Sequence, residues 1–252
     1  MLAVHWLSRG GPATSPKENI VRFAHFLVPA ALTAALLAGC GTTPSAPSSS
    51  PTPSKSAALS ATEVIQKSQQ ALTKAGSYRM KGNVVESGDK MSIDVKVQGS
   101  DSFALISMGD QGSITVLNVG GASYFQADEV FWKKTGGIDA KTYTSVFKDK
   151  WVKVKAGDAN MQKFTEFTDA KTFLDPTGSQ SMTVGEKTTI NGSSAWTLRD
   201  ASSSGSALYV AAEGEPYPLR VEHGTDGKID FSDFGAKFDE IKAPPADKVI
   251  SI

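Results

Sequence analysis

The residue with the clearest chemistry in this chain is Cys40, the only cysteine among 252 residues. It closes the run Leu37-Ala38-Gly39-Cys40, directly after an apolar stretch from Phe23 to Leu37. Arg22 and Lys17 supply a positive flank, and the stretch is shorter than the roughly 20 residues that span a bilayer. The pattern predicts a cleaved leader that ends just before Cys40. An ordinary secretory signal followed by a chance cysteine is the alternative.

The tetrapeptide before and including Cys40 resembles the lipobox of bacterial lipoproteins. This resemblance implies cleavage before Cys40, a diacylglycerol on its sulfur and export of everything that follows. We therefore expect residues 1–39 to be a lipoprotein signal peptide. Two acyl chains hold a protein at a membrane where one holds it only reversibly. The expected location is the extracytoplasmic face of the cell membrane, with the lipid as the anchor.

A spacer is expected to follow the anchor, over residues 40–58. Residues 41–56 read GTTPSAPSSSPTPSKS and contain no large apolar side chain. Such a segment cannot bury enough surface to offset the entropy of ordering it, so we expect it to be extended and disordered. The remaining residues, 59–252, have the length of one domain with a core of its own.

The residues that could support catalysis are sparse in this domain. His223 is its only histidine, so a serine, histidine and acid triad would depend on it alone. Ser145-Val146-Phe147-Lys148 and Lys134-Thr135-Gly136 match fragments of penicillin-binding-protein motifs, but in reversed order and without the third motif. We expect no catalytic residues and a surface position for His223.

Metal sites and nucleic-acid binding are also disfavoured by the sequence. One histidine and no free thiol provide no zinc site, and Asp226, Asp230 and Asp233 lack the spacing of a calcium loop. The leader holds three of the 26 basic and one of the 26 acidic residues, which leaves 23 and 25. This slight negative charge argues against nucleic acid as a partner. We expect neither a cofactor nor a metal.

Four lysines nevertheless form a local basic cluster around a tryptophan: Lys148, Lys150, Lys153 and Lys155. They alternate with Trp151, Val152 and Val154, as the solvent side of a strand would. We favour that interpretation over a patch for anionic lipid.

A helix from Ala61 to Ala75 should open the domain. Ser60-Ala61-Thr62-Glu63 forms a capping box, and Gly76 lies where a helix terminator belongs. Its apolar residues recur on one face, which must pack against another layer.

Period-two alternation then predicts a meander of antiparallel strands. The expected strands cover Tyr78–Val84, Met91–Val97, Phe103–Met108, Ser113–Val119, Ala122–Gln126 and Val130–Lys134. Two helices should follow, at Ile138–Lys148 and Asn160–Leu174. A second meander is expected at Met182–Ile190, Ala195–Arg199, Ala207–Ala212, Leu219–His223 and Lys228–Asp233.

The order of these features resembles the LppX/LprG-type actinobacterial lipoproteins, relatives of the LolA-like carrier fold. Local sequence carries the resemblance at Trp151-Val152-Lys153-Val154, at Thr188 to Trp196, and at Pro216 to Val221. It implies an α+β fold: a strongly curved antiparallel sheet, or half-barrel, with helices on its concave face. It also implies a monomer whose partners are the membrane, a lipid or glycolipid ligand, and an envelope transporter.

A sheet covered by only three helices can leave a gap between its two layers. We expect lipid-binding residues there: Met80, Val84, Ile93, Val95, Phe147, Phe164 and Phe167. An acyl chain in the gap would gain about 0.8 kcal/mol per methylene removed from water. The alternative is that these residues close a dry core, and that the domain serves as an envelope interaction or sensor module. A contiguous apolar cavity would favour the carrier.

Overall fold

The structure, a computed structural model, describes residues 59–86, 89–135, 139–155, 174, 181–200 and 205–251. All of them belong to one compact unit, Leu59–Ile252. The predicted leader, Cys40 and the spacer lie outside the described residues. So does the predicted helix at 160–174, except for Leu174.

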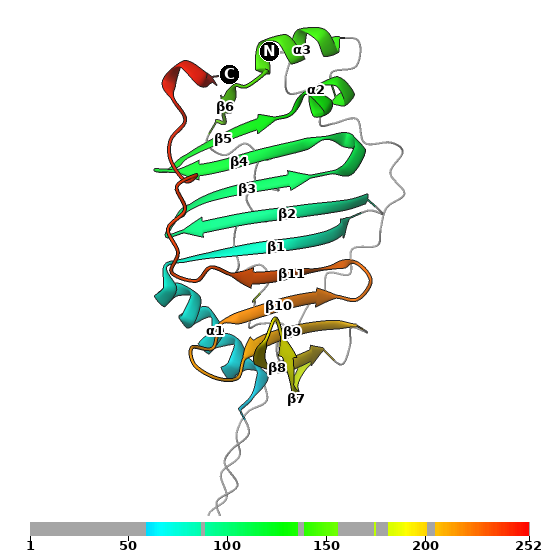
Figure 1. Ribbon diagram of the computed structural model, residues 1–252, viewed down its shortest axis with the longest axis vertical. Helices are drawn as coiled ribbons and strands as arrows, with labels where there is room; N and C mark the ends of the chain where they lie inside the picture. The colour runs from blue at the N-terminus through cyan, green and yellow to red at the C-terminus, as the bar shows by residue number, and fades with distance from the viewer. Residues whose placement is uncertain are drawn as a thin grey trace, which may run out of the picture. The chain divides into compact units, whose positions relative to one another are not determined.

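Twelve strands form one sheet in the described part of the chain, in the order β12-β6-β5-β4-β3-β2-β1-β11-β10-β9-β8-β7 (Figure 1). Two runs of sequential strands meet where β1 pairs with β11, and the strands turn progressively along the sheet so that it curves. The predicted α+β fold on one large curved antiparallel sheet is confirmed. The strands are β1 (Ser77–Glu86), β2 (Asp89–Gln98), β3 (Asp101–Ser107), β4 (Ser113–Val119), β5 (Ala122–Ala127), β6 (Trp151–Lys153), β7 (Met182–Ile190), β8 (Ser193–Asp200), β9 (Ser206–Ala211), β10 (Pro218–His223), β11 (Gly227–Ser232) and β12 (Val249–Ser251).

Helix α1 (Ala61–Ala75) has the predicted boundaries and both predicted caps. Its first turn is closed by the capping box, in which Ser60 Oγ accepts from the Glu63 amide and the Glu63 carboxylate accepts from the Ser60 amide. Gly76 ends the helix in the left-handed region at φ 70°, which glycine adopts without steric cost. The helix therefore begins and ends where local chemistry dictates.

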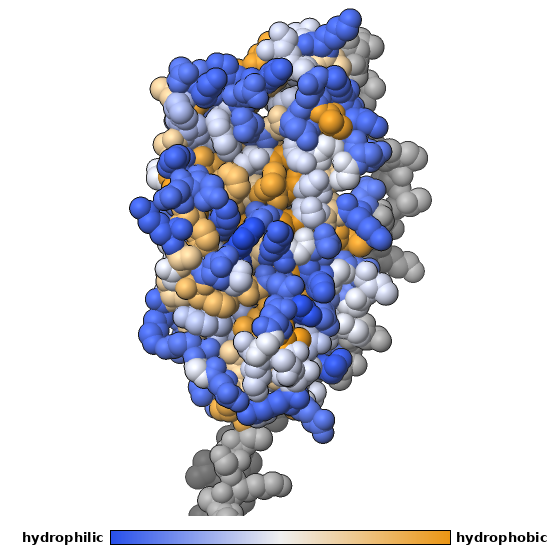
Figure 2. All heavy atoms as spheres, viewed as in Figure 1, coloured by the Kyte–Doolittle hydropathy of each residue, from blue (hydrophilic) through white to orange (hydrophobic). Residues whose placement is uncertain are grey.

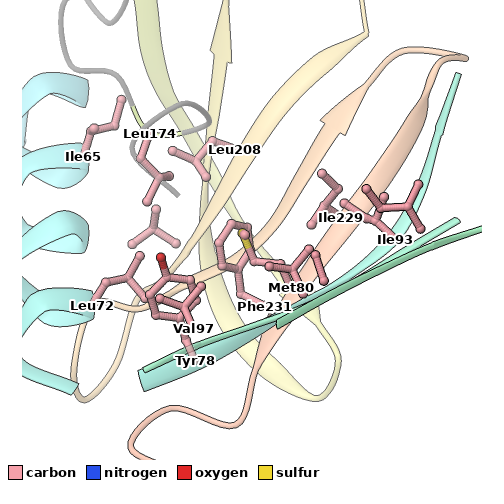
Figure 3. Packing of buried hydrophobic residues seen from close by; sticks show 14 of the residues in the cluster. Ile65, Leu72, Tyr78, Met80, Ile93, Val97, Leu174, Leu208, Ile229 and Phe231 are labelled. Atoms are coloured by element: carbon pink, nitrogen blue, oxygen red, sulfur yellow. The ribbon is translucent and has the colours of Figure 1, made fainter. Parts of the chain in front are cut away.

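The core lies between α1 and one face of the sheet, which we call the inner face. Alternation along β1 and β2 puts Met80, Ile93 and Val95 on this face, all at most 2% exposed. Figure 3 shows Ile65 and Leu72 of α1 directed toward the same cluster. The apolar face of α1 thus packs on part of the inner face, with contacts to β1, β7 and β9, as its sequence pattern predicts.

The segment predicted as a strand at Val130–Lys134 is instead helix α2 (Glu129–Thr135), so that prediction is wrong. Val130, Phe131 and Trp132 favour a strand by propensity, but Asp128 caps a helix there. Its carboxylate accepts from the amide of Phe131 at 2.8 Å and from the amide of Ser113 at 2.8 Å. Capping outweighs the intrinsic preference of this short run.

Helix α3 (Ala140–Phe147) confirms the described part of the helix predicted at 138–148. Most predicted strands are confirmed, with ends that differ by a few residues. Strand β12 has no counterpart among the predicted strands; it pairs in parallel with β6, so the C-terminal segment returns to the first meander. Two short 3₁₀ turns complete the described elements, η1 at Gly109–Gln111 and η5 at Ala246–Lys248.

The opposite, outer face of the sheet carries charged pairs. Arg79 of β1 donates from Nε to Asp94 Oδ1 of β2 at 2.7 Å, and a second bond joins the same two side chains. The hydrogen bonds from Arg79 lower the pKa of Asp94, and burial opposes this only in part. On β10 and β11, Arg220 pairs with Asp230 at 2.6 Å in the same way.

Candidate functional site

The residues predicted to bind lipid fall into two groups. Met80, Val84, Ile93 and Val95 come together on the inner face, because Met80 lies opposite Val95 and Gly82 lies opposite Ile93 across β1 and β2. Val84 is only half-buried and packs against the edge of the core cluster. These four share a surface as predicted, whereas their role as lipid contacts stays a prediction.

Phe147 lies elsewhere, in an aromatic cluster formed by α2 and α3. Its ring stacks on Trp132 with centroids 4.9 Å apart, and Tyr143 stacks on the same indole at 6.2 Å. The Trp132 Nε1 donates to the Ala127 carbonyl at 3.1 Å, which fixes the indole at the end of β5. Phe164 and Phe167 lie outside the described residues.

The centre of the inner face is close-packed. Met80, Val95 and Val116 are 0% exposed, so their side chains contact other protein atoms on every side. Such residues cannot contact a guest unless the packing around them changes. This part of the molecule has the character of a core.

A pocket of about 940 Å³ opens beside this core, between the C-terminal half of α1 and the ends of β1, β2 and β3. Ligand pockets usually measure about 300 to 1,000 Å³, so the volume is large enough for a lipid-sized guest. The described residues that line it are Gln69, Gln70, Leu72, Thr73, Lys74, Gly76, Tyr78, Val97, Gly99, Ser100, Asp101, Ser102 and Leu174. A smaller pocket of about 270 Å³ lies near the start of α1.

The base of the larger pocket is apolar and continuous with the core. Leu72, Tyr78, Val97 and Leu174 line the pocket and also belong to the buried cluster. Figure 3 shows Leu72, Tyr78 and Val97 pointing toward one another, with Leu174 between α1 and Leu208. A guest in the pocket would therefore extend the core rather than open it.

The rim of the pocket is polar. Gln69 Nε2 donates to the Leu174 carbonyl at 2.6 Å and ties α1 to that residue. Lys74 forms an ion pair with Glu215, and both side chains are largely exposed. The hydrogen bond that Lys74 donates to Glu215 raises the pKa of Lys74, so this ammonium is held in its charged form. The site as a whole is an apolar base under a polar opening.

The rest of the described surface offers no competing chemical site. His223 is exposed at the end of β10, and no group of three metal-ligating side chains occurs among the described residues. Figure 2 shows hydrophilic side chains over much of one face, with hydrophobic residues gathered over the middle strands. In the same described ranges, no helix is long and apolar enough to cross a membrane.

Comparisons with known proteins give structural similarity only. No family model and no curated protein matches the chain. An uncharacterized conserved protein from Thermus thermophilus has a TM-score of 0.40 and 11% identity over 76% of this chain and 99% of its own. LprF from Mycobacterium bovis has a TM-score of 0.42 and 14% identity over 73% of this chain and 96% of its own.

A third similar structure is the complex of MucA and MucB from Pseudomonas aeruginosa. Its TM-score is 0.38 and its identity 12%, over 73% of this chain and 61% of the other chain. LprF is of the LppX/LprG family and MucB has a LolA-like fold, the family and fold that the sequence predicts. With TM-scores below 0.5, these similarities carry no argument about function, which has to come from the chain's own residues.

Proposed function

We propose that this chain is an extracytoplasmic lipoprotein, anchored through Cys40, that binds the acyl chain of an amphiphile and catalyses no reaction. The observation that carries the proposal is the pocket of about 940 Å³ with an apolar base between α1 and the sheet. Its volume lies within the usual range for ligand sites. The guest would occupy this pocket rather than the closed centre of the inner face.

Hydrophobic burial supplies the affinity in this proposal. Each methylene removed from water contributes about 0.8 kcal/mol, so a long chain needs few polar contacts to be held. Leu72, Tyr78 and Val97 provide the surface against which it would lie. Because the base is already part of the core, loading requires no rearrangement of the sheet.

The proposal of a lipid anchor at Cys40 is supported by the sequence alone. The apolar stretch at 23–37, the small residues at 38–39 and the single thiol at Cys40 form a leader with a lipidation site. The polar segment from 41 to 56 would hold the domain up to about 50 Å from the membrane, at roughly 3.1 Å per residue. Labelling cells with a palmitate analogue tests this: the wild-type chain should carry the label and Cys40→Ala should not.

The pocket is tested by recovering lipid from the full chain purified from its own host. Thr73→Trp places a large ring at an exposed position of α1 that lines the pocket. Gln66→Trp is the matched control, since Gln66 is exposed on the same helix and lines neither pocket. Solvent extraction and mass spectrometry should find near-stoichiometric lipid on the wild type and on Gln66→Trp. Thr73→Trp should have lost most of it.

A second candidate is an envelope interaction module with a filled interior. The complete burial of Met80, Val95 and Val116 favours it for the centre of the sheet. Leu105 of β3 also exposes 42% of its surface on the outer face, where a partner could bind. Wild-type protein without lipid, or equal lipid on Thr73→Trp, would select this module and reject the carrier.

A further inference from the structure

A polar row interrupts the apolar inner face beside the pocket. The strand registers place Tyr78 opposite Val97, Val97 opposite Ser102, Ser102 opposite Asn118, and Asn118 opposite Ser123. The row thus changes from apolar on β1 and β2 to polar on β3, β4 and β5. The next row on the same face is apolar throughout and consists of Met80, Val95, Ala104, Val116 and Phe125.

The three polar residues form a directed hydrogen-bond relay. The Ser123 hydroxyl donates to Asn118 Oδ1 at 2.7 Å, and Asn118 Nδ2 donates to Ser102 Oγ at 2.9 Å. Ser102 is only 4% exposed and is the member of the relay that lines the pocket. Since its oxygen accepts from Asn118, its own proton is directed away from the relay. Within the described residues, no acceptor is found for that proton.

A guest that fills the pocket displaces the water beside Ser102, and a buried hydroxyl then left without an acceptor costs free energy. A guest that offers an oxygen acceptor at the pocket wall would remove this cost. Hydrogen bonds in a chain also polarise one another, so the relay makes Ser102 a better donor than a lone serine. The relay therefore favours a ligand whose polar end carries carbonyl or hydroxyl oxygens.

The charges around the pocket disfavour an anionic polar end. Lys74 is already paired with Glu215. Asp101 also lines the pocket, and its Oδ1 accepts from the Gly120 amide at 3.1 Å. With Lys74 neutralised, the carboxylate of Asp101 leaves the described lining with a negative charge. An anionic headgroup would lose hydration without gaining an unpaired cation.

We propose that the Ser123–Asn118–Ser102 relay binds the oxygen-bearing polar end of an uncharged amphiphile, and that Asp101 disfavours an anionic one of the same chain length. This inference rests on the proposed function, because the relay acts on a guest whose acyl chain lies in the pocket. The relay favours a polar end over a bare alkyl chain, Asp101 disfavours an anion, and the apolar base supplies most of the affinity.

Three guests with sixteen-carbon chains separate these contributions: 1-monopalmitoylglycerol, palmitate and hexadecane. The purified full chain, stripped of lipid, is equilibrated with all three in equal amounts. It is then captured, and its bound guests are extracted and quantified by mass spectrometry. Wild-type protein should bind monopalmitoylglycerol in about fivefold preference to hexadecane, the effect of one hydrogen bond. It should also prefer it to palmitate, because Asp101 repels the carboxylate. Hexadecane should bind through its chain alone.

Ser102→Ala should abolish the preference for monopalmitoylglycerol over hexadecane and leave the preference over palmitate, which Asp101 maintains. Ser102→Thr keeps a hydroxyl and should restore the preference over hexadecane in part. Ser107→Ala is the matched control, since Ser107 bonds to Ser113 at 3.2 Å on the same two strands but does not line the pocket. Thermal unfolding of each variant shows whether the fold is retained.

The outcomes separate the two proposals. If wild-type protein binds none of the three guests, the proposed function fails. If it binds all three without preference, or if Ser102→Ala keeps the wild-type preference for monopalmitoylglycerol over hexadecane, the pocket stands and the relay is overturned. A preference for palmitate would overturn the role of Asp101, because the carboxylate would then be bound by a cation.

Discussion

Two neighbouring rows on the inner face of one sheet differ in what they do. Met80, Val95 and Val116 lie in one row and are each 0% exposed. Two residues along each strand, in the next row on the same face, Tyr78 and Val97 are 8% exposed and line a pocket. Strand alternation sends both rows to the same face. Whether a row becomes core or cavity is decided by what packs above it, and above Tyr78 and Val97 residues of α1 line the pocket.

The largest effect should come from adding a side chain where two strands of the core approach each other closely. Gly82 of β1 lies opposite Ile93 and Ile229, and a Cβ there would be 1.9 Å from the Lys228 carbonyl oxygen. Because that atom is backbone, strand β11 would have to shift. Gly82→Ala should lower the free energy of unfolding by about 4 kcal/mol, above the usual cost of overpacking. Denaturant unfolding measures this loss.

Gly185 of β7 is the matched control, since a Cβ at that position meets only the Thr197 carbonyl oxygen, at 3.4 Å. Gly185→Ala should change stability by less than about 1 kcal/mol, because alanine is if anything the better strand residue. Equal losses for the two variants would show that the close approach of β1 and β11 does not matter.

The same substitution in both rows sharpens the comparison directly. Val95→Thr puts a hydroxyl where no water or partner reaches it and should cost about 2 kcal/mol. Val97→Thr puts it at the pocket, where water can bind, and should cost less than about 1 kcal/mol. Thermal or denaturant unfolding gives both values. Similar costs at the two positions would mean that the pocket is dry or closed in solution.

Asp94 on the outer face should make a smaller, pH-dependent contribution to the free energy of unfolding. Hydrogen bonds from Arg79 lower the pKa of Asp94 in the folded state. Its stabilisation is therefore complete above the unfolded pKa of about 4 and is lost as the pH falls through the folded value. Asp94→Asn should remove about 1 kcal/mol at neutral pH and flatten the decline in stability below about pH 4. If the stability of Asp94→Asn declined below about pH 4 as steeply as that of the wild type, this role for Asp94 would be refuted.

An effect of similar size concerns the N-terminal cap of α1, the helix that lines the pocket. Ser60 caps α1 by accepting from the Glu63 amide at 3.2 Å. Ser60→Ala should cost about 1 kcal/mol, whereas Ser60→Asp should cost little because aspartate caps equally well. Both are measured by denaturant unfolding. If α1 were held by packing alone, the two variants would be indistinguishable.

Local rules predict most of the fold. The boundaries of α1 follow from Ser60, Glu63 and Gly76, which act within one turn of the helix. The strands follow from alternation, and a tight turn at Asn191-Gly192 separates β7 from β8 as predicted. The turn predicted at Asp226-Gly227 is instead centred on Gly224-Thr225, where the Asp226 amide donates to the His223 carbonyl at 2.8 Å, and Gly227 begins β11. These signals depend only on residues near one another in the chain. They can therefore be read without knowing the tertiary structure.

The wrong prediction at α2 has a competing local cause, and the failure to predict β12 has a non-local one. For α2, the strand propensity of Val130, Phe131 and Trp132 is outweighed by the Asp128 cap, a signal that was present in the sequence. Strand β12 has three residues and joins β6 only after the chain has returned across the domain. No local sequence pattern predicts that β12 pairs with β6.

The candidate site was predictable only in part. Alternation assigns Met80, Ile93 and Val95 to the inner face, but it cannot show that α1 leaves the pocket farther along. The polar relay could not be found at all, because Ser102, Asn118 and Ser123 become neighbours only through the registers of β3, β4 and β5.

The pairing of β1 with β11 has a consequence for how the domain assembles. A nascent chain makes β1 first, yet the partner that completes its second edge, Gly227–Ser232, appears only when nearly all of the domain has been synthesised. Closing such a distant contact is slow. Until then the long edge of β1 stays open to wrong pairings with other chains, so the interval before closure is when this protein is most vulnerable to aggregation.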